Sequence, residues 1–264
     1  MKIAIFKRKT ALAFILGLLS GVFFQQASGW SLFGGGKDIK LSGITQKKEY
    51  CLNPYTSITL VCSANVLVRP ALEGQKGRVE IKTDEALLPH IKIRVNSNNT
   101  LEIKADNLSY SSCTIEIICY VDQLEEVVIS GSGKVKMDDE LWEKHTKNKI
   151  NNVRLSIAGS GSIHLSCLDV TKKLTTDISG SGSIVVKGVA ASYEAKVSGS
   201  GKANAYELLA TDATVIISGS GEAKVFASHT LNIIISGNGN CWYRGNPKNI
   251  HEKISGSGKI RKES

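Results

Sequence analysis

Alternation of apolar and polar residues runs through most of the chain after residue 43 and predicts β-strands. Apolar residues at 91–95 alternate with basic ones, a polar stretch follows at 96–99, and the alternation resumes at 101–103. That arrangement is typical of a β-hairpin. Residues 113–119 alternate as well and predict another strand. We therefore expect the segment 44–126 to consist of short strands and hairpins.

The segment 127–264 differs because a glycine-rich tripeptide recurs in it. Gly-Ser-Gly begins at six positions, Gly-Asn-Gly stands at a seventh, and the intervals between them are 18–28 residues. A repeat of this period is typical of a solenoid. The repeated glycines are Gly131, Gly133, Gly159, Gly161, Gly180, Gly182, Gly199, Gly201, Gly219, Gly221, Gly237, Gly239, Gly256 and Gly258.

Aligned on the first glycine, the seven copies place one class of residue in each column. Two residues before that glycine, every copy has a β-branched residue, namely Ile129, Ile157, Ile178, Val197, Ile217, Ile235 and Ile254. Apolar residues continue at even offsets and polar residues stand mostly at odd offsets, which predicts strands with one buried face. Shared columns imply coils stacked in register, about 4.8 Å apart. The chain is therefore predicted to be all-β, with a parallel β-helix of about seven coils preceded by a β-rich N-terminal segment.

Three details refine this prediction. The paired glycines share the parity of the buried columns, so we expect them to permit a sharp bend or a close backbone approach. An insertion at 138–149 is expected to form a helical turn capped by its aspartates, with Leu141 and Trp142 packed on the coil. Lys262 enters an apolar column in the last copy and would blunt the open end of the stack.

The N-terminus has the pattern of a secretory signal. Basic residues precede an apolar run of about 14 residues, too short to span a bilayer, and small residues follow it. We expect a signal peptide at 1–29, a flexible lead at 30–43, and an exported chain in the periplasm or at the cell surface, with no membrane span after cleavage. The formal charge is +9, and it falls to 29 minus 24, or +5, without residues 1–29. The sequence has no run of five like charges and no interleaving of aromatic and basic residues, so it does not favour a nucleic-acid partner.

Export places the six cysteines in an oxidising compartment. Cys113 and Cys119 lie about 20 Å apart on one predicted strand, and Cys167 and Cys241 are four coils apart, so neither pair can form a disulfide. We expect Cys167 and Cys241 to be buried free thiols. Cys51 and Cys62 are then left as partners for Cys113 and Cys119. We expect two disulfides confined to the N-terminal segment, and which of the two pairs with which is left open.

The sequence contains no strong motif for catalysis or for ligand binding. The five histidines are scattered along the chain and none has zinc-ligand spacing: His90, His145, His164, His229 and His251. Gly-Ser-Gly-Lys lacks the spacing of a phosphate-binding loop. The insertion offers Asp138, Asp139, Glu140 and His145, for which a solvated helical turn is the simpler interpretation. We predict no catalytic, cofactor-binding or metal-binding residues and no cofactor.

The seven copies of Ile-Ser-Gly-Ser-Gly and its variants, behind a β-rich segment and a signal sequence, resemble the bacterial "putative adhesin" family with the head GIN domain. The resemblance covers roughly residues 44–260. It implies a right-handed β-helix similar in shape to pectin lyases but without their catalytic residues, and a role in adhesion. A membrane barrel or anchor at the C-terminus is not expected.

These observations favour an exported, non-catalytic binding module that presents β-helix faces to carbohydrate or protein. Two alternatives stay open. One is a polysaccharide-degrading β-helix enzyme, and the other is an envelope scaffold that assembles end to end through its open coils.

Overall fold

The computed structural model describes residues 37–105, 108–109, 113–145 and 149–263. Gly36–Ser264 form one compact unit, which contains both the segment 44–126 and the repeats of 127–264. The predicted signal peptide and residues 30–36 of the predicted lead lie outside the described residues.

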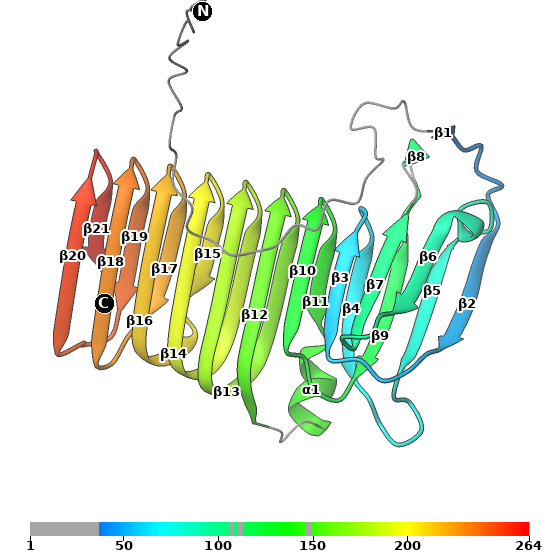
Figure 1. Cartoon of the computed structure of the whole chain (residues 1–264), viewed down its shortest axis with the longest axis horizontal. Helices are drawn as coiled ribbons and strands as arrows, with labels where there is room; N and C mark the ends of the chain where they lie inside the picture. The colour runs from blue at the N-terminus through cyan, green and yellow to red at the C-terminus, as the bar shows by residue number, and fades with distance from the viewer. Residues whose placement is uncertain (1–36, 106–107, 110–112, 146–148, 264) are drawn as a thin grey trace, which may run out of the picture. The chain divides into compact units, whose positions relative to one another are not determined.

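Within this unit, two layers of parallel strands face each other across one apolar core (Figure 1). Sheet 1 contains, in spatial order, β7 (Thr100–Ala105), β3 (Ser57–Val61), β10 (Glu126–Gly131), β12 (Ile150–Gly159), the second parts of β13 (Ser162–Gly180) and β14 (Ser183–Gly199), β16 (Leu208–Gly219), β18 (Thr230–Gly237) and β20 (Asn249–Ser255). Sheet 2 contains β9 (Glu116–Val121), β4 (Asn65–Pro70), β11 (Lys134–Met137), the first parts of β13 and β14, β15 (Lys202–Ala205), β17 (Glu222–Phe226), β19 (Asn240–Arg244) and β21 (Lys259–Lys262). The predicted parallel β-helix is confirmed.

The β-solenoid has about six turns, slightly fewer than the seven coils that the repeats predict. The seventh repeat forms β20 and β21, the last strands of the two sheets among the described residues.

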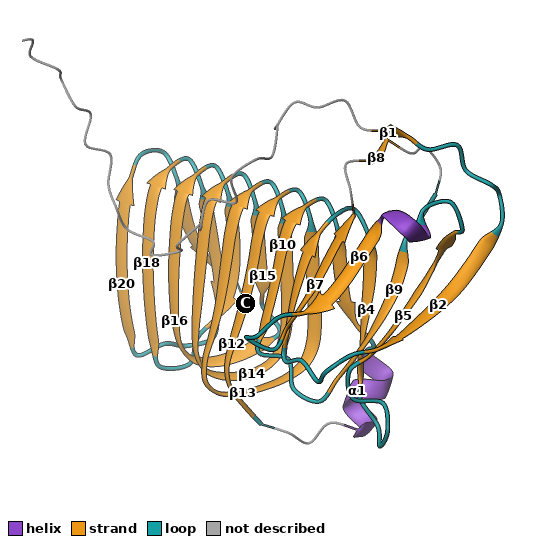
Figure 2. Cartoon of the chain, turned by 45° about the vertical axis from the view of Figure 1, so that its right-hand side comes forward, coloured by secondary structure: helices purple, strands orange, loops and turns teal. Residues whose placement is uncertain are grey.

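At the N-terminal end the order of strands in space departs from their order in the sequence. The coil β3–β4 lies between β7–β9 on one side and β10–β11 on the other. Antiparallel strands then border the outermost coil (Figure 2): β6 (Ile91–Val95) pairs with β7, β5 (Arg78–Asp84) with β9, and β2 (Thr45–Cys51) with β5. The predicted hairpin is confirmed as β6–β7. The strand predicted at 113–119 begins three residues later, at Glu116.

Short elements complete this end of the molecule. They are the strand pair β1 (Lys37–Asp38) and β8 (Leu108–Ser109), and the 3-10 helix η1 (Leu88–His90).

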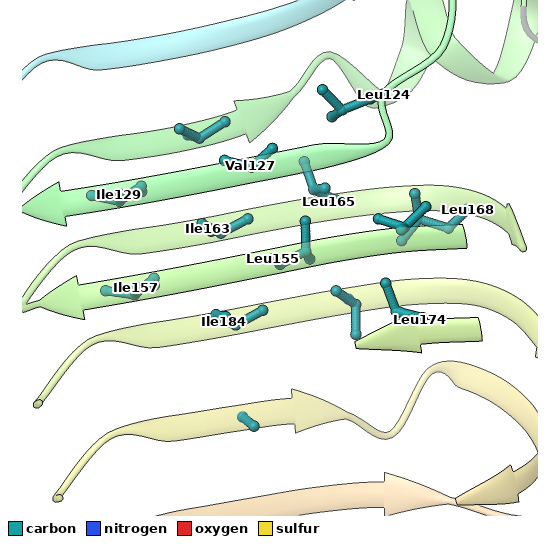
Figure 3. Close-up of a cluster of buried hydrophobic side chains, with 14 of the residues drawn as sticks. Leu124, Val127, Ile129, Leu155, Ile157, Ile163, Leu165, Leu168, Leu174 and Ile184 are labelled. Atoms are coloured by element: carbon teal, nitrogen blue, oxygen red, sulfur yellow. The ribbon is translucent and has the colours of Figure 1, made fainter. Parts of the chain in front are cut away.

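The predicted column of β-branched residues forms one continuous stack inside the solenoid. Each member pairs with the next in register, from Ile129 through Ile157 to Ile235, and Leu60 and Ile103 extend the column in the N-terminal coils. Figure 3 shows Ile129 and Ile157 on neighbouring strands beside further buried leucines. Ile254 is the exception, being 43% exposed, because β20 has no described strand beyond it.

The two glycines of each corner meet different physical requirements. At the first glycine the backbone has a positive φ, for example +114° at Gly199, a conformation that L-residues with a side chain rarely adopt. The second glycine lacks space: a Cβ on Gly239 would lie 2.4 Å from Ile217 Cγ2 in the preceding coil. Both roles match the expectation of a sharp bend together with a close approach.

The insertion forms α1 (Asp139–His145), as predicted. Asp138 Oδ1 accepts a hydrogen bond from the Leu141 backbone N–H at 3.4 Å, and Trp142 is buried in the core. Asp138 Oδ2 lies 2.9 Å from Arg69 Nε, so this carboxylate also ties the helix start to sheet 2.

The expected burial of Cys167 is wrong. A register shift between Leu165 and Leu168 puts an irregularity into β13, so that Ser166 turns inward while Cys167 is exposed with φ +58°. Cys241, by contrast, is buried as predicted.

The C-terminal edge of the solenoid carries charged residues at core parity. Glu252 of β20 pairs in register with buried Ile233, and Lys262 of β21 pairs with buried Tyr243. Inward-pointing charges on edge strands oppose the addition of a further strand, because the added strand would bury them.

We therefore expect the double variant Glu252→Ile, Lys262→Val to self-associate more strongly than the wild-type protein. The substitutions extend two apolar columns to an edge whose backbone groups are free to pair. Sedimentation velocity across a concentration series measures the shift in mass. Lys253→Ile, which changes an outward position of the same strand, is the control, and equal behaviour of the two variants would contradict the role given to the inward charges.

Candidate functional site

The outward side of sheet 2 is strongly basic. Along β11, residues 162–165 of β13, residues 183–186 of β14, β15, β17, β19 and β21, the outward positions of the strands hold seven basic residues and one acidic residue, Glu222. We call this surface the basic face. Its basic residues are Lys134, Lys136, Lys202, Lys224, Arg244, Lys259 and Arg261.

The outward side of sheet 1 has no such excess. The equivalent positions from β10 to β20 hold four basic and four acidic residues, namely Glu126, Arg154, Lys173, Asp177, Glu194, Lys196, Asp212 and Lys253. Most of them neutralise each other: Arg154 Nη2 lies 2.8 Å from Asp177 Oδ2, and Glu194 accepts from Lys173 and Lys196. The two broad surfaces of one solenoid therefore differ sharply in electrostatic potential.

An aromatic cluster lies on the basic face near its C-terminal end. It consists of Tyr206, which follows β15, Phe226 of β17 and Trp242 of β19, all partly exposed. The Lys224 ammonium group lies 5.6 Å from the ring centroids of both Tyr206 and Trp242, and the Arg244 guanidinium lies 4.3 Å from that of Tyr206. Rings and cations at these distances attract each other through the ring quadrupole, so the cluster is a preformed platform that combines flat apolar surface with positive charge.

A groove of about 710 Å³ lies at the other end of the same side, over β2, β5, β9, β4 and β11. Outward side chains of Leu67 and Ile118 give it an apolar centre, and four lysines border it: Lys47, Lys82, Lys134 and Lys136. Two of these lysines are neutralised, Lys47 by Glu80 at 2.7 Å and Lys82 by Glu116 at 3.3 Å. Lys134 and Lys136 belong to both the groove and the basic face.

Glu80 is the most constrained ionisable group in the groove. Its carboxylate accepts hydrogen bonds from Lys47 Nζ at 2.7 Å, Arg78 Nη2 at 2.8 Å and the Tyr120 hydroxyl at 3.0 Å, and its side chain is only 7% exposed. The Lys47 ammonium group, with the Tyr120 hydroxyl and the Arg78 guanidinium, holds the pKa of the Glu80 carboxyl below its ordinary value. This network connects β2, β5 and β9 where they form the groove wall.

Glu80→Gln is expected to lower the free energy of unfolding by about 1–3 kcal/mol at pH 7, because it removes a charged acceptor from three donors. A carboxyl whose pKa is lowered by folding stabilises the protein above its unfolded pKa, and that contribution is lost as the pH falls through the folded-state pKa. The difference between wild type and variant should therefore shrink in acid. Urea unfolding at pH 7 and pH 4 tests this, with exposed Glu116→Gln as the control that changes stability little.

The residues singled out from the sequence do not converge on one site. Across the described ranges, no group of three or more His, Cys, Asp or Glu side chains could hold a metal ion. Asp138, Asp139 and Glu140 act at the start of α1, and the side chain of His145 lies outside the described residues. His164 is a partly exposed outward residue of sheet 2, and His229 lies 3.4 Å from Asp212 on the surface.

All six cysteines are free thiols in the structure. Cys119 is buried in the core, whereas Cys51 is exposed, opposite Arg78. Cys62 and Cys113 are partly buried, and Cys113 Sγ lies 3.6 Å from Thr83 Oγ1. Disulfide formation among these four in an oxidising compartment stays a prediction, and peptide mapping of the non-reduced protein tests it.

The basic face was missed by sequence reasoning, which searched for carboxylates and histidines. A signal was present: Tyr206, Phe226 and Arg244 all stand seven residues after the first glycine of their copies. The chain shows no interleaving of aromatic and basic residues along the sequence, but the stacking of coils creates one across neighbouring strands.

The fold and this surface define a β-solenoid protein with a broad, preformed polar face. Residues 54–247 match the family described as "Putative auto-transporter adhesin, head GIN domain", and the chain belongs to that family. No curated protein matches the sequence.

Solved structures show the same fold. A putative adhesin from Bacteroides fragilis has a TM-score of 0.75 at 20% identity, with 86% of this chain and 100% of that chain covered. A putative lipid binding protein from Parabacteroides distasonis has a TM-score of 0.66 at 25% identity, with the same coverage. A putative adhesin from Parabacteroides merdae has a TM-score of 0.61 at 18% identity, covering 86% of this chain and 99% of that one.

Proposed function

We propose that the protein is an exported, non-catalytic binding module that acts in adhesion and holds its ligand on the basic face. The family and the structures of similar fold are named as adhesins, which supports binding to some partner. The observation that carries the choice of face is the platform of Tyr206, Lys224, Trp242 and Arg244. It lies on a side that also holds four cations without an acidic ion-pair partner among the described residues, namely Lys134, Lys136, Lys259 and Arg261.

Rigidity also supports a binding role. The outward side chains of sheet 2 project from strands whose backbones pair in register with neighbours on both sides, so their spacing is fixed before a ligand arrives. A preformed surface of this kind loses little conformational entropy on binding.

Charge reversal on the basic face tests the proposal. The triple variant Lys136→Glu, Lys202→Glu, Lys224→Glu should lose binding to immobilised glycans and cell surfaces by tenfold or more, since each change removes an attraction and adds a repulsion. The matched control is Lys173→Glu, Lys196→Glu, Lys253→Glu, which makes the same change in net charge on sheet 1. Retained binding in the first variant, or an equal loss of binding in both variants, would contradict the assignment of ligand binding to the basic face.

A second measurement distinguishes a binding module from a polysaccharide-degrading enzyme. Histidine is the commonest general acid–base residue, and none of the histidines in the described ranges lies among the residues of the platform. A variant with all five histidines changed to Gln is expected to bind as the wild type does. Turnover in a polysaccharide depolymerisation assay, or loss of binding in this variant, would favour an enzyme.

Lipid binding is a second candidate function, favoured by the groove. Leu67 and Ile118 offer apolar contact beside four lysines, and the structure at 25% identity is described as a putative lipid binding protein. Co-sedimentation with phosphatidylglycerol vesicles tests it: Leu67→Asp should abolish lipid binding there, while the charge-reversal control on sheet 1 should not.

Export is the third part of the proposal and rests on the basic and apolar pattern of residues 1–29. Over the described part of the chain, no helix is long and apolar enough to cross a membrane. Fractionation of the native host cell, with and without residues 1–29, distinguishes periplasm, cell surface and medium.

A further inference from the structure

We infer that the ligand of the basic face is an acidic polysaccharide, carrying carboxylate or sulfate groups, which lies along the solenoid axis. This inference rests on the proposed function and adds the chemical class and the orientation of the ligand. Three features of the face carry it, namely the free charges, their spacing and the residues between them.

The first feature is uncompensated positive charge. Lys202 and Lys224 share one carboxylate, that of Glu222, at 3.9 and 3.5 Å, and Arg244 Nη2 lies 3.7 Å from Glu263 Oε2. Within the described chain, Lys134, Lys136, Lys259 and Arg261 form no ion pair with an acidic side chain. Like charges held on a rigid surface repel each other, and a polyanion would relieve that repulsion along the whole face.

The second feature is the spacing of the cations in two straight rows. One row runs through paired residues from Lys134 by way of Lys202 to Lys259, and each interval is three strand steps, or about 14 Å. The second row runs from Lys136 of β11 by way of Lys224 of β17 to Arg261 of β21, with intervals of four and two strand steps. A small anion would meet one or two of these charges, whereas an extended chain with repeated anionic groups meets them all.

The third feature is the chemistry between the cations. The positions between the cations hold Ser162, Ser183, Glu222 and Asn240 in the first row, and His164, Val185, Asn204 and Trp242 in the second. The serine hydroxyls and asparagine amides can form hydrogen bonds with hydroxyl-rich rings. Trp242 and Tyr206 add flat surfaces on which the C–H side of a sugar ring can pack. The face therefore provides the charges, hydrogen-bonding groups and stacking surfaces that an acidic sugar chain requires.

Other polyanions fit less well. Single-stranded nucleic acid is held by aromatic residues repeated along the strand, whereas the aromatic residues here gather at one end. A lipid surface needs continuous apolar contact, but Val185 is the only apolar outward residue between Lys136 and Lys224 in their row.

Affinity electrophoresis and calorimetry with polygalacturonate and dextran sulfate, against neutral dextran, test the inference on the purified protein. We expect binding to the acidic polymers, weakened by salt because exposed charges are screened. The variant Lys134→Gln, Lys202→Gln, Arg261→Gln should lower affinity for them roughly tenfold, and Trp242→Ala should lower it at high salt as well. Replacement of Lys173, Lys196 and Lys253 by Gln, on sheet 1, is the control.

The outcomes separate this inference from the proposed function. Equal affinity for neutral dextran at the basic face would overturn the acidic ligand and leave the binding face intact. Tighter binding to oligothymidylate or to phosphatidylglycerol vesicles would overturn the polysaccharide class. Binding lost in the sheet 1 variant and kept in the basic-face variants would overturn both.

Discussion

Gly199→Val should lower the free energy of unfolding by roughly 3–5 kcal/mol, a large part of the stability of an ordinary domain. The backbone at Gly199 has φ +114°, which a β-branched residue adopts only under strain. A Cβ there would also lie 2.8 Å from the backbone oxygen of Gly180 in the preceding coil, and a backbone atom cannot move aside as a flexible side chain does. Chemical denaturation followed by circular dichroism measures the change.

Ser200→Val is the matched control, because it introduces the same side chain at the same corner. Ser200 is exposed, and its backbone N–H donates to Gly180 O at 3.0 Å whatever side chain it carries. Its effect should stay within about 0.5 kcal/mol. If the two variants lost similar stability, the corner would be sensitive to bulk in general and the glycine requirement would be wrong.

The stacked columns could be predicted from the sequence because the solenoid repeats itself. Each copy contributes Ile or Val at one offset, and pairing in register follows once seven copies share that offset. Cys167 could not be placed in this way. A local irregularity at 165–168 changes which residues of the strand point inward, and no feature of the repeat predicts it.

The N-terminal coils escaped prediction for a physical reason. Leu60 and Asn65 pair with Ile129 and Lys134, so Cys62 and Ala64 occupy the places of the two corner glycines. This coil has the geometry of the repeat without its sequence. This coil also lies between β7–β9 and β10–β11, so the order of the coils in space differs from their order in the chain. A local sequence pattern does not reveal such a change of order.

The excess positive charge of the basic face becomes apparent only when the outward residues of the two sheets are counted separately. The sequence does not show which sheet each residue belongs to. Basic and acidic residues both stand at outward offsets in the repeats, and only the assignment of each strand to sheet 1 or sheet 2 shows that the charges of sheet 1 are balanced while those of sheet 2 are not. Net charge alone, at +9, gives no indication of this asymmetry.

Ile217→Ala is the second large change, and we expect it to lower the free energy of unfolding by about 2–4 kcal/mol. Ile217 is fully buried, with Val197 and Ile235 paired to it on the two sides. Its Cγ2 also defines the surface against which Gly239 packs. Because both neighbouring coils are fixed by their own hydrogen bonds, the cavity left by alanine cannot close, and the lost contacts are not replaced.

Ile254→Ala is the control, since it removes the same atoms from the same column. Ile254 is 43% exposed at the last strand, so it loses less buried surface and leaves no enclosed cavity, and we expect a change of less than about 1 kcal/mol. Urea unfolding of the two variants beside the wild type gives the comparison. Equal losses of unfolding free energy in the two variants would mean that the end of the stack is covered in solution, which would favour assembly through the open coil. A small loss for Ile217→Ala would mean that the column is not packed as the structure shows.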